Sequence, residues 1–187
     1  MKKKIVILGS TGSIGKSTLD VIKKDKKNFD IILLTANKNY KKLIEQAKEF
    51  NVKNVLIKNV SFYPKVKKNL KNFSVKVYTG EVPLKKIISQ KVDFTVSGIV
   101  GIAGLQPTLE VIKFSKTLAI ANKESIICGW KLISKKAKKY RTKIVPVDSE
   151  HFSIMELTKN TKDEDVEEII ITASGGPFLN TKIKKLK

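Results

Sequence analysis

The chain has 187 residues, a formal net charge of +21 at pH 7 and a hydrophobic share of 41%. That apolar share is enough for a folded core, and the single cysteine, Cys128, excludes a disulfide framework and a multi-cysteine metal site. No apolar run approaches the roughly 20 residues of a membrane-spanning helix, and no secretory signal follows Met1. We therefore expect no membrane association and a cytoplasmic location, or the stroma of a plastid-type organelle.

The positive charge comes from lysine, because Arg141 is the only arginine among the 38 basic residues. Nucleic-acid readers rely on the bidentate guanidinium fork of arginine, and no RNP, KH, zinc-finger or helix-turn-helix pattern is present. We expect a solvated lysine surface and no nucleic-acid partner. A basic nucleic-acid-binding module remains an alternative.

Short β-rich runs alternate with stretches that have apolar residues at helical spacing. The runs predict strands at residues 4–8, 30–35, 54–57, 75–78, 92–97, 117–121, 143–147 and 168–173. Strands alternating with helices form right-handed βαβ units, and strands that are apolar on successive residues are covered on both faces. The pattern predicts an α/β fold with a Rossmann-like, doubly wound parallel sheet.

Two of the expected helices have apolar stripes that we place in the core. The first begins near Ser13 and turns Ile14, Thr18, Val21 and Ile22 inward. Another carries Ile126, Trp130, Ile133, Ala137 and Tyr140 on one face, and we expect Cys128 to pack in the core with them.

A glycine loop follows the first strand, where Gly9, Gly12 and Gly15 precede or open a helix. In such loops the first glycine permits a tight turn, the second lets a pyrophosphate approach the backbone, and the third lets the helix pack closely on the strand. The N–H groups at the helix start favour phosphate. The loop therefore predicts a dinucleotide-binding domain.

Two alternatives to a dinucleotide loop stay open. Gly15, Lys16 and Ser17 resemble the end of a nucleotide triphosphatase P-loop, but that motif needs glycine where this chain has Ser10. A tight turn without any ligand is the other alternative.

The end of the second strand indicates which dinucleotide binds. An NAD site usually has an acid there for the ribose 2′-hydroxyl, whereas this chain has Asn37, Lys38 and Asn39. A lysine attracts the 2′-phosphate that an acid would repel. We expect NADP rather than NAD.

Polar residues follow three later strands. A second glycine loop at residues 98–104 either flanks the nicotinamide or only permits tight packing. Lys123 follows the next strand and can hold a phosphate or a carbonyl oxygen. Asp148 and Glu150 come after another strand and offer two hard oxygen ligands to Mg²⁺ or Mn²⁺, or else mark a helix start. We assign no role to His151.

The last glycine segment, at residues 174–178, follows the eighth predicted strand and is close to the end of the chain. Because ligands bind at such loops and only nine residues follow Phe178, we expect the chain to be the front part of a longer protein.

Four motifs together resemble the 1-deoxy-D-xylulose 5-phosphate reductoisomerase family. They are GSTGSIG at residues 9–15, LAIANKES at 118–125, PVDSEH at 146–151 and SGGPF at 174–178. The resemblance covers the first half of the family's length. It implies that residues 1–148 form an NADPH-binding Rossmann domain and that residues 149–187 begin a truncated α/β catalytic domain. It implies NADPH- and metal-dependent isomerisation and reduction of 1-deoxy-D-xylulose 5-phosphate, a phosphorylated sugar, to 2-C-methyl-D-erythritol 4-phosphate in non-mevalonate isoprenoid biosynthesis.

The resemblance also implies residue roles. NADPH would contact Thr11, Gly12, Ser13, Ile14, Asn37, Lys38, Asn39, Asn122 and Glu124. The substrate would contact Lys123, Ser149, Glu150 and Ser174, with Lys123 and Glu150 catalytic. The metal, Mg²⁺ or Mn²⁺, would bind Asp148 and Glu150.

The family's third metal carboxylate, its flap and its helical domain would follow Lys187. The chain alone is therefore expected to bind NADPH poorly or moderately and to turn over little or nothing. The family resemblance implies a homodimer for the full-length protein. A non-catalytic Rossmann remnant is the other alternative.

Overall fold

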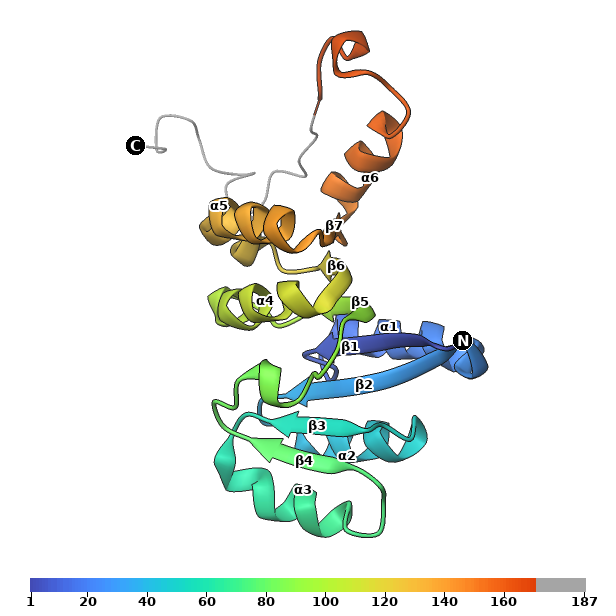
Figure 1. The fold of residues 1–187 in the computed structure, drawn as a ribbon, viewed down its shortest axis with the longest axis vertical. Coiled ribbons are helices and arrows are strands. Elements are labelled where there is room, and N and C mark those ends of the chain that lie inside the picture. Colours follow the sequence, from blue (N-terminus) through green and yellow to red (C-terminus); the bar gives the residue numbers. More distant parts are fainter. Residues whose placement is uncertain (171–187) are drawn as a thin grey trace, which may run out of the picture. The chain divides into compact units, whose positions relative to one another are not determined.

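The computed structural model of the chain describes residues 1–170. Its centre is a seven-stranded parallel sheet with the order β4-β3-β2-β1-β5-β6-β7, in which β1 lies between β2 and β5 (Figure 1). The strands are β1 (Lys3–Leu8), β2 (Phe29–Ala36), β3 (Asn54–Ile57), β4 (Lys76–Thr79), β5 (Val92–Ser97), β6 (Ser115–Ile120) and β7 (Lys143–Pro146).

Helices connect these strands. The α-helices are α1 (Ser13–Lys24), α2 (Tyr40–Glu49), α3 (Tyr63–Asn69), α4 (Leu105–Val111), α5 (Lys123–Tyr140) and α6 (Ser149–Thr158). Short 3-10 turns supplement them: η1 (Lys26–Asn28), η2 (Val60–Phe62), η3 (Leu84–Lys86), η4 (Ile102–Gly104), η5 (Ile112–Phe114) and η6 (Asp163–Asp165). Every pair of neighbouring strands in the sheet is parallel, as the βαβ arrangement predicted from the alternating pattern requires.

The sheet is covered on both faces by separate hydrophobic cores. Alternate residues of β1 divide between them, because successive side chains of a strand point to opposite faces. Ile5 and Ile7 join the core formed with α1, α2 and α3. Val6 and Leu8 join the core formed with α4 and α5. The fold is therefore the doubly wound α/β class that the sequence predicts.

The strand order reverses between β1 and β5. From β4, at one edge of the sheet, the chain returns to pair β5 with β1. Both central strands end in glycine, with Gly9 after Leu8 and Gly98 after Ser97, and the Gly98 N–H donates to the Leu8 carbonyl oxygen at 2.9 Å. Doubly wound sheets bind ligands outside the carboxyl ends of their strands at this kind of reversal.

Seven of the eight predicted strands are present, with ends shifted by at most two residues. The eighth, predicted at 168–173, is not a strand over its described part, residues 168–170. A strand needs a hydrogen-bonded neighbour, and in the described part of the chain those three residues pair with none. Residues 171–173 lie outside the described residues.

The predicted core face of α5 is wrong at two positions. Trp130 is 51% exposed and Cys128 is also exposed, whereas Ser125, Gly129, Ile133 and Ala137 are the buried residues of this helix. A Cβ on Gly129 would collide with the Leu105 side chain, so the missing side chain lets α5 approach α4 along that face. Trp130, one residue further on, is thereby turned outward. Val21 of α1 is likewise exposed, since Leu19 and Ile22 form that helix's buried face.

Contacts divide the chain into two compact units, residues 1–148 and 149–187. The sheet and α1 to α5 belong to the first, and α6 begins the second. Over residues 1–170 no helix is long and apolar enough to cross a membrane. The cofactor and catalytic roles expected for the two segments stay predictions.

Candidate functional site

The first glycine loop is built by close backbone contacts. Gly9 has φ +81°, a conformation that favours glycine, and a Cβ there would lie 2.9 Å from the Gly98 carbonyl oxygen. A Cβ on Gly15 would lie 2.5 Å from the Gly9 oxygen. Gly9 therefore allows the predicted tight turn and also lets the two glycine loops touch. Gly15 lets α1 pack closely, on the turn after β1 rather than on the strand itself.

The loop is also anchored to β2 and α2. The Gly9 N–H donates to Thr35 Oγ1 at 2.9 Å. The buried Ser10 hydroxyl donates to Gln46 Oε1 at 2.8 Å, and Gln46 Nε2 donates back to the Ser10 carbonyl oxygen at 2.9 Å. These paired hydrogen bonds fix the turn that precedes Gly12. The sequence analysis did not single out Gln46, because its position in an amphipathic helix carries no sign of a partner in the loop.

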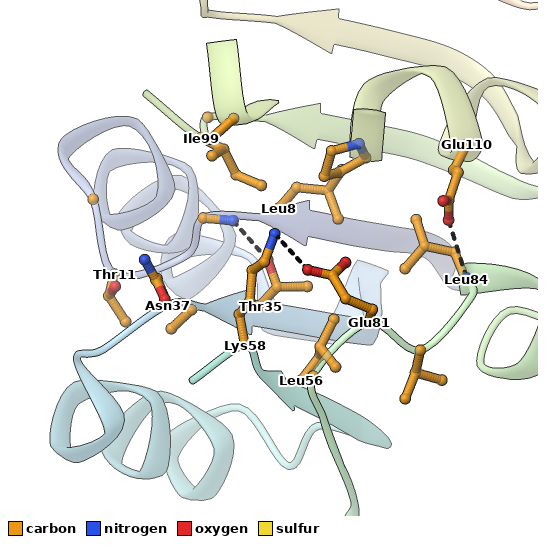
Figure 2. A pocket seen from close by; sticks show the side chains of 18 of the residues that line it. Leu8, Thr11, Thr35, Asn37, Leu56, Lys58, Glu81, Leu84, Ile99 and Glu110 are labelled. Carbon is orange, nitrogen blue, oxygen red and sulfur yellow. Dashed lines mark hydrogen bonds and ion pairs between the residues drawn. The ribbon is translucent and has the colours of Figure 1, made fainter. Parts of the chain in front are cut away.

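A cavity of about 500 Å³ opens beside this loop, at the carboxyl ends of the central strands (Figure 2). Thr11 and Gly12 form one wall, and Gly98, Ile99 and other residues of the second glycine loop form another. Gly12 is the N-cap residue of α1 and has no side chain to cover the first turn of that helix. The cavity thus presents backbone and a helix start on one side, an arrangement suited to a dinucleotide pyrophosphate.

The far end of the cavity is formed by the ends of β2, β3 and β4. Asn37 lines the cavity, whereas Lys38 and Asn39 are exposed beside it. Asn39 also caps α2, since its side-chain oxygen accepts from the Lys42 N–H at 3.2 Å. No acid stands at the end of β2, but Lys58 and Glu81, which the sequence analysis did not assign, also line this end.

The segment from Gly80 to Leu84 closes one side of the cavity. Its Leu84 N–H donates to the Glu110 carboxylate of α4 at 3.3 Å (Figure 2). The Gln106 side chain donates to the same carboxylate at 3.2 Å. Glu110 therefore connects the β4–β5 link to α4. Sequence patterns give no signal for such a contact between segments 26 residues apart.

Asn122 holds the second glycine loop. It is 5% exposed, and its Nδ2 donates to the carbonyl oxygens of Ile99 and Gly101. Its Oδ1 accepts from the Ser125 N–H at 2.7 Å, which caps α5. The structure therefore gives Asn122 a positioning role, and its contact with a cofactor stays a prediction.

Lys123 and Glu124 occupy the first turn of α5, at the carboxyl end of β6. Lys123 is exposed and Glu124 is half-buried. Neither lines the 500 Å³ cavity, while Ser13 and Ile14 lie in the first turn of α1 next to it. The structure brings Thr11, Gly12 and Asn37 together but leaves the roles of Lys123 and Glu124 as predictions.

The predicted metal ligands stand around the start of α6. Glu150 lies in the first turn of that helix and Asp148 directly precedes it. In the described segment, residues 1–170, no three His, Cys, Asp or Glu side chains gather as a metal-binding group. The donor chemistry of two carboxylates suits Mg²⁺ or Mn²⁺, but their metal role stays a prediction, as does the substrate role of Ser149. Ser174 lies outside the described residues.

The doubly wound sheet, the glycine loop at its strand-order reversal and the adjoining cavity define an α/β domain of the dinucleotide-binding class. A family model described as 1-deoxy-D-xylulose 5-phosphate reductoisomerase matches residues 5–129, and that of the C-terminal domain of the same enzyme matches residues 144–187. The chain belongs to the 1-deoxy-D-xylulose 5-phosphate reductoisomerase family.

Similar proteins carry the same name. The reductoisomerase of Pelagibacter ubique is 58% identical over 187 residues, which are 99% of this chain and 48% of that protein. That of Wolbachia from Culex pipiens is 47% identical over 99% of this chain and 47% of its own length. The chain thus spans about half the length of the curated relatives it matches.

Solved structures agree with this assignment. The Zymomonas mobilis reductoisomerase in complex with NADPH has a TM-score of 0.90 and 40% identity, over 97% of this chain and 48% of its own. A reductoisomerase in complex with NADPH, fosmidomycin and magnesium has a TM-score of 0.84 and 32% identity, with the same coverage. Both matches show the same fold class for the described part of the chain.

Proposed function

We propose that this chain forms the cofactor-binding part of an enzyme that isomerises and reduces 1-deoxy-D-xylulose 5-phosphate to 2-C-methyl-D-erythritol 4-phosphate. In this proposal residues 1–148 bind NADPH and residues 149–187 begin the substrate and metal domain. The observation that carries it is the glycine cradle: a Cβ on Gly9 or Gly15 would overlap backbone, and Gly12 borders a cavity of about 500 Å³. In doubly wound folds that bind dinucleotides, such a cradle holds the pyrophosphate.

The residues at the two ends of the cavity have separate tasks in the proposed complex. Thr11, Gly12, Ser13 and Ile14 surround the pyrophosphate at the start of α1. Gly12 contributes a close backbone approach and no free donor, because its N–H donates to the Gly9 carbonyl oxygen at 3.1 Å. Asn37, Lys38 and Asn39 surround the adenosine end, where a lysine rather than an acid favours a 2′-phosphate. The absence of an acid at the end of β2 supports NADPH over NADH.

The nicotinamide end is assigned to the second glycine loop and the start of α5. Asn122 fixes the loop through the carbonyl oxygens of Ile99 and Gly101, so that the loop keeps a constant shape beside the bound cofactor. We assign Glu124 to the cofactor and Lys123 to the anionic substrate on the family resemblance; both residues lie in the first turn of α5. When bound, NADPH supplies a hydride. The protein aligns the cofactor with the substrate and excludes water from the site.

For the metal we propose Asp148 and Glu150 as two oxygen ligands and Ser149, with Glu150, as a substrate contact. Mg²⁺ is usually bound through one or two carboxylates plus waters or substrate oxygens, and the pair fits that donor chemistry. A bound divalent ion would act as a Lewis acid toward the substrate's oxygens. Ser174 is proposed for the substrate phosphate from its motif alone.

For the whole protein we also propose a cytoplasmic location and a homodimer, on the family resemblance. Cell fractionation, and light scattering of the full-length protein, test these two statements. A protein that sediments with membranes, or a strictly monomeric full-length protein, would contradict them.

The experiment for the proposed function follows NADPH binding and turnover in the same preparation. NADPH fluorescence should change saturably on titration with the 187-residue chain, and an excess of duplex DNA at low salt should not displace the nucleotide. NADPH oxidation with 1-deoxy-D-xylulose 5-phosphate and Mg²⁺ should be negligible for this chain and appear in a polypeptide of full family length. DNA binding without NADPH binding would contradict the proposal, and so would steady-state turnover by the chain alone.

A further inference from the structure

Lys58 lies at the end of the cavity where the adenosine is proposed to bind. It directly follows β3, and its N–H donates to the Ala36 carbonyl oxygen at 2.8 Å. Just beyond the strands, a second hydrogen bond joins the Asn59 N–H to the Asn37 carbonyl oxygen at 3.2 Å. Lys58 is thereby fixed beside the end of β2, next to the residues proposed to surround the adenosine.

The Lys58 side chain contacts Glu81 in this structure. Its Nζ is 3.1 Å from Glu81 Oε1, and both residues line the cavity (Figure 2). Glu81 follows Gly80, whose φ of +72° turns the chain after β4, and Glu110 fixes the other end of this segment through Leu84. The ion pair therefore bridges the ends of β3 and β4 at the cavity rim.

Another anion can readily replace Glu81 as the partner of Lys58. The Lys58 side chain is 50% exposed and that of Glu81 is 85% exposed. Exposed ion pairs contribute little to stability because water screens them. A phosphate monoester has close to two negative charges at neutral pH and accepts several hydrogen bonds, so it competes well with one carboxylate for the same ammonium group.

We propose that Lys58 is a second cofactor-selecting cation, in addition to Lys38, and that it exchanges Glu81 for the 2′-phosphate of NADPH. The inference rests on the proposed NADPH-binding function and goes beyond it, because neither residue belongs to the motifs that carry the family resemblance. NADH has only a hydroxyl at this position. With NADH bound, Lys58 stays with Glu81, so the ammonium discriminates between the two nucleotides.

The test measures dissociation constants of NADPH and NADH by calorimetry for the wild-type chain, K58Q, E81Q and K53Q. Lys53 is the matched control, because it precedes the same strand at its opposite end and pairs with Asp30 at 2.6 Å. K58Q should weaken NADPH binding about tenfold and leave NADH binding unchanged, since a charge-assisted contact is lost only with NADPH. E81Q should tighten NADPH binding about twofold to threefold by removing the competitor. K53Q should change neither constant.

The outcomes separate this inference from the proposed function. If K58Q binds NADPH like the wild type, or loses affinity for both nucleotides equally, Lys58 does not select the cofactor and the inference is overturned. Thermal melting of each variant shows whether a lost affinity reflects a lost fold. A folded wild-type chain that binds neither nucleotide contradicts the proposed function itself and this inference with it. NADPH binding with an unchanged NADPH-to-NADH ratio in K58Q contradicts the inference alone.

Discussion

The side chain of Asn122 and the backbone of Gly101 are joined by a hydrogen bond of 2.8 Å that ties the second glycine loop to the start of α5. The same amide group donates to Ile99 and accepts from the Ser125 N–H, so one buried side chain satisfies three backbone groups. Gly101 has φ +73°, a turn that favours glycine. The shape of this loop beside the cavity therefore depends on Asn122.

Replacing Asn122 with alanine should lower the free energy of unfolding by about 2–3 kcal/mol, because the cap of α5 is lost and two carbonyl oxygens lose their donor. Urea unfolding measures the loss. Asn69→Ala is the matched control, since Asn69 is exposed and bonds only to Lys65 within its own helix. Equal losses in the two variants would show that Asn122 does not hold the loop.

Two alanine substitutions in the first glycine loop should have different effects, one on stability and the other on NADPH binding. A Cβ at Gly15 would lie 2.5 Å from the Gly9 oxygen and from Ser10 Cα, so Gly15→Ala should destabilise the fold. A Cβ at Gly12 would lie 3.4 Å from the Gly9 oxygen, an ordinary contact, but it would border the cavity. Gly12→Ala should melt within a few degrees of the wild type and bind NADPH at least about tenfold more weakly. An unchanged affinity of Gly12→Ala for NADPH would show that the pyrophosphate does not bind at this loop.

Gln46 should be needed for the shape of the first loop. Gln46→Leu keeps the volume but leaves the Ser10 carbonyl oxygen without its side-chain donor, so stability should fall by about 2 kcal/mol. NADPH affinity should fall as well, because the turn before Gly12 loosens. Gln90→Leu is the control, because it makes the same exchange at an exposed position. Chemical denaturation measures the free energy of unfolding of both variants. Equal losses in the two would show that the Gln46–Ser10 contact contributes nothing to stability.

The strands and the first glycine loop were predictable because they depend on local sequence. A run such as 4–8 is apolar on successive residues, which indicates a strand covered on both faces, and the glycines after it indicate a tight turn into a helix. The outward turn of Trp130 was not predictable, since it depends on how closely Gly129 approaches Leu105. The contact of Lys58 with Glu81 was not predictable either, because it joins two strand ends that only the sheet order brings together.

Asp93 should make stability depend on pH. The Lys116 ammonium, 2.8 Å from Oδ1, and then the Lys4 N–H, 2.8 Å from Oδ2, hold the pKa of Asp93 below its ordinary value. The stabilisation is therefore complete above the pKa of an unfolded aspartate, about 3.9, and is lost as the pH falls through the lower folded pKa.

Asp93→Asn should thus cost about 1 kcal/mol at pH 7 and progressively less as the pH falls below about 4. Urea unfolding at pH 7, 4 and 2.5 measures this, with Asp20→Asn, at an exposed position of α1, as the control. A difference between wild type and Asp93→Asn that grows on acidification would contradict the assignment of the lowered pKa.

The most direct test of the central claim, that NADPH lies across the first glycine loop and the end of β2, is a titration of the ¹⁵N-labelled chain with NADPH followed by its backbone amide spectrum. The largest shifts should fall on residues 11–14 and 37–39, next to the cavity, and NADH should shift residues 37–39 less. Shifts concentrated at the amino ends of the strands, or no shifts at saturating NADPH, would contradict it.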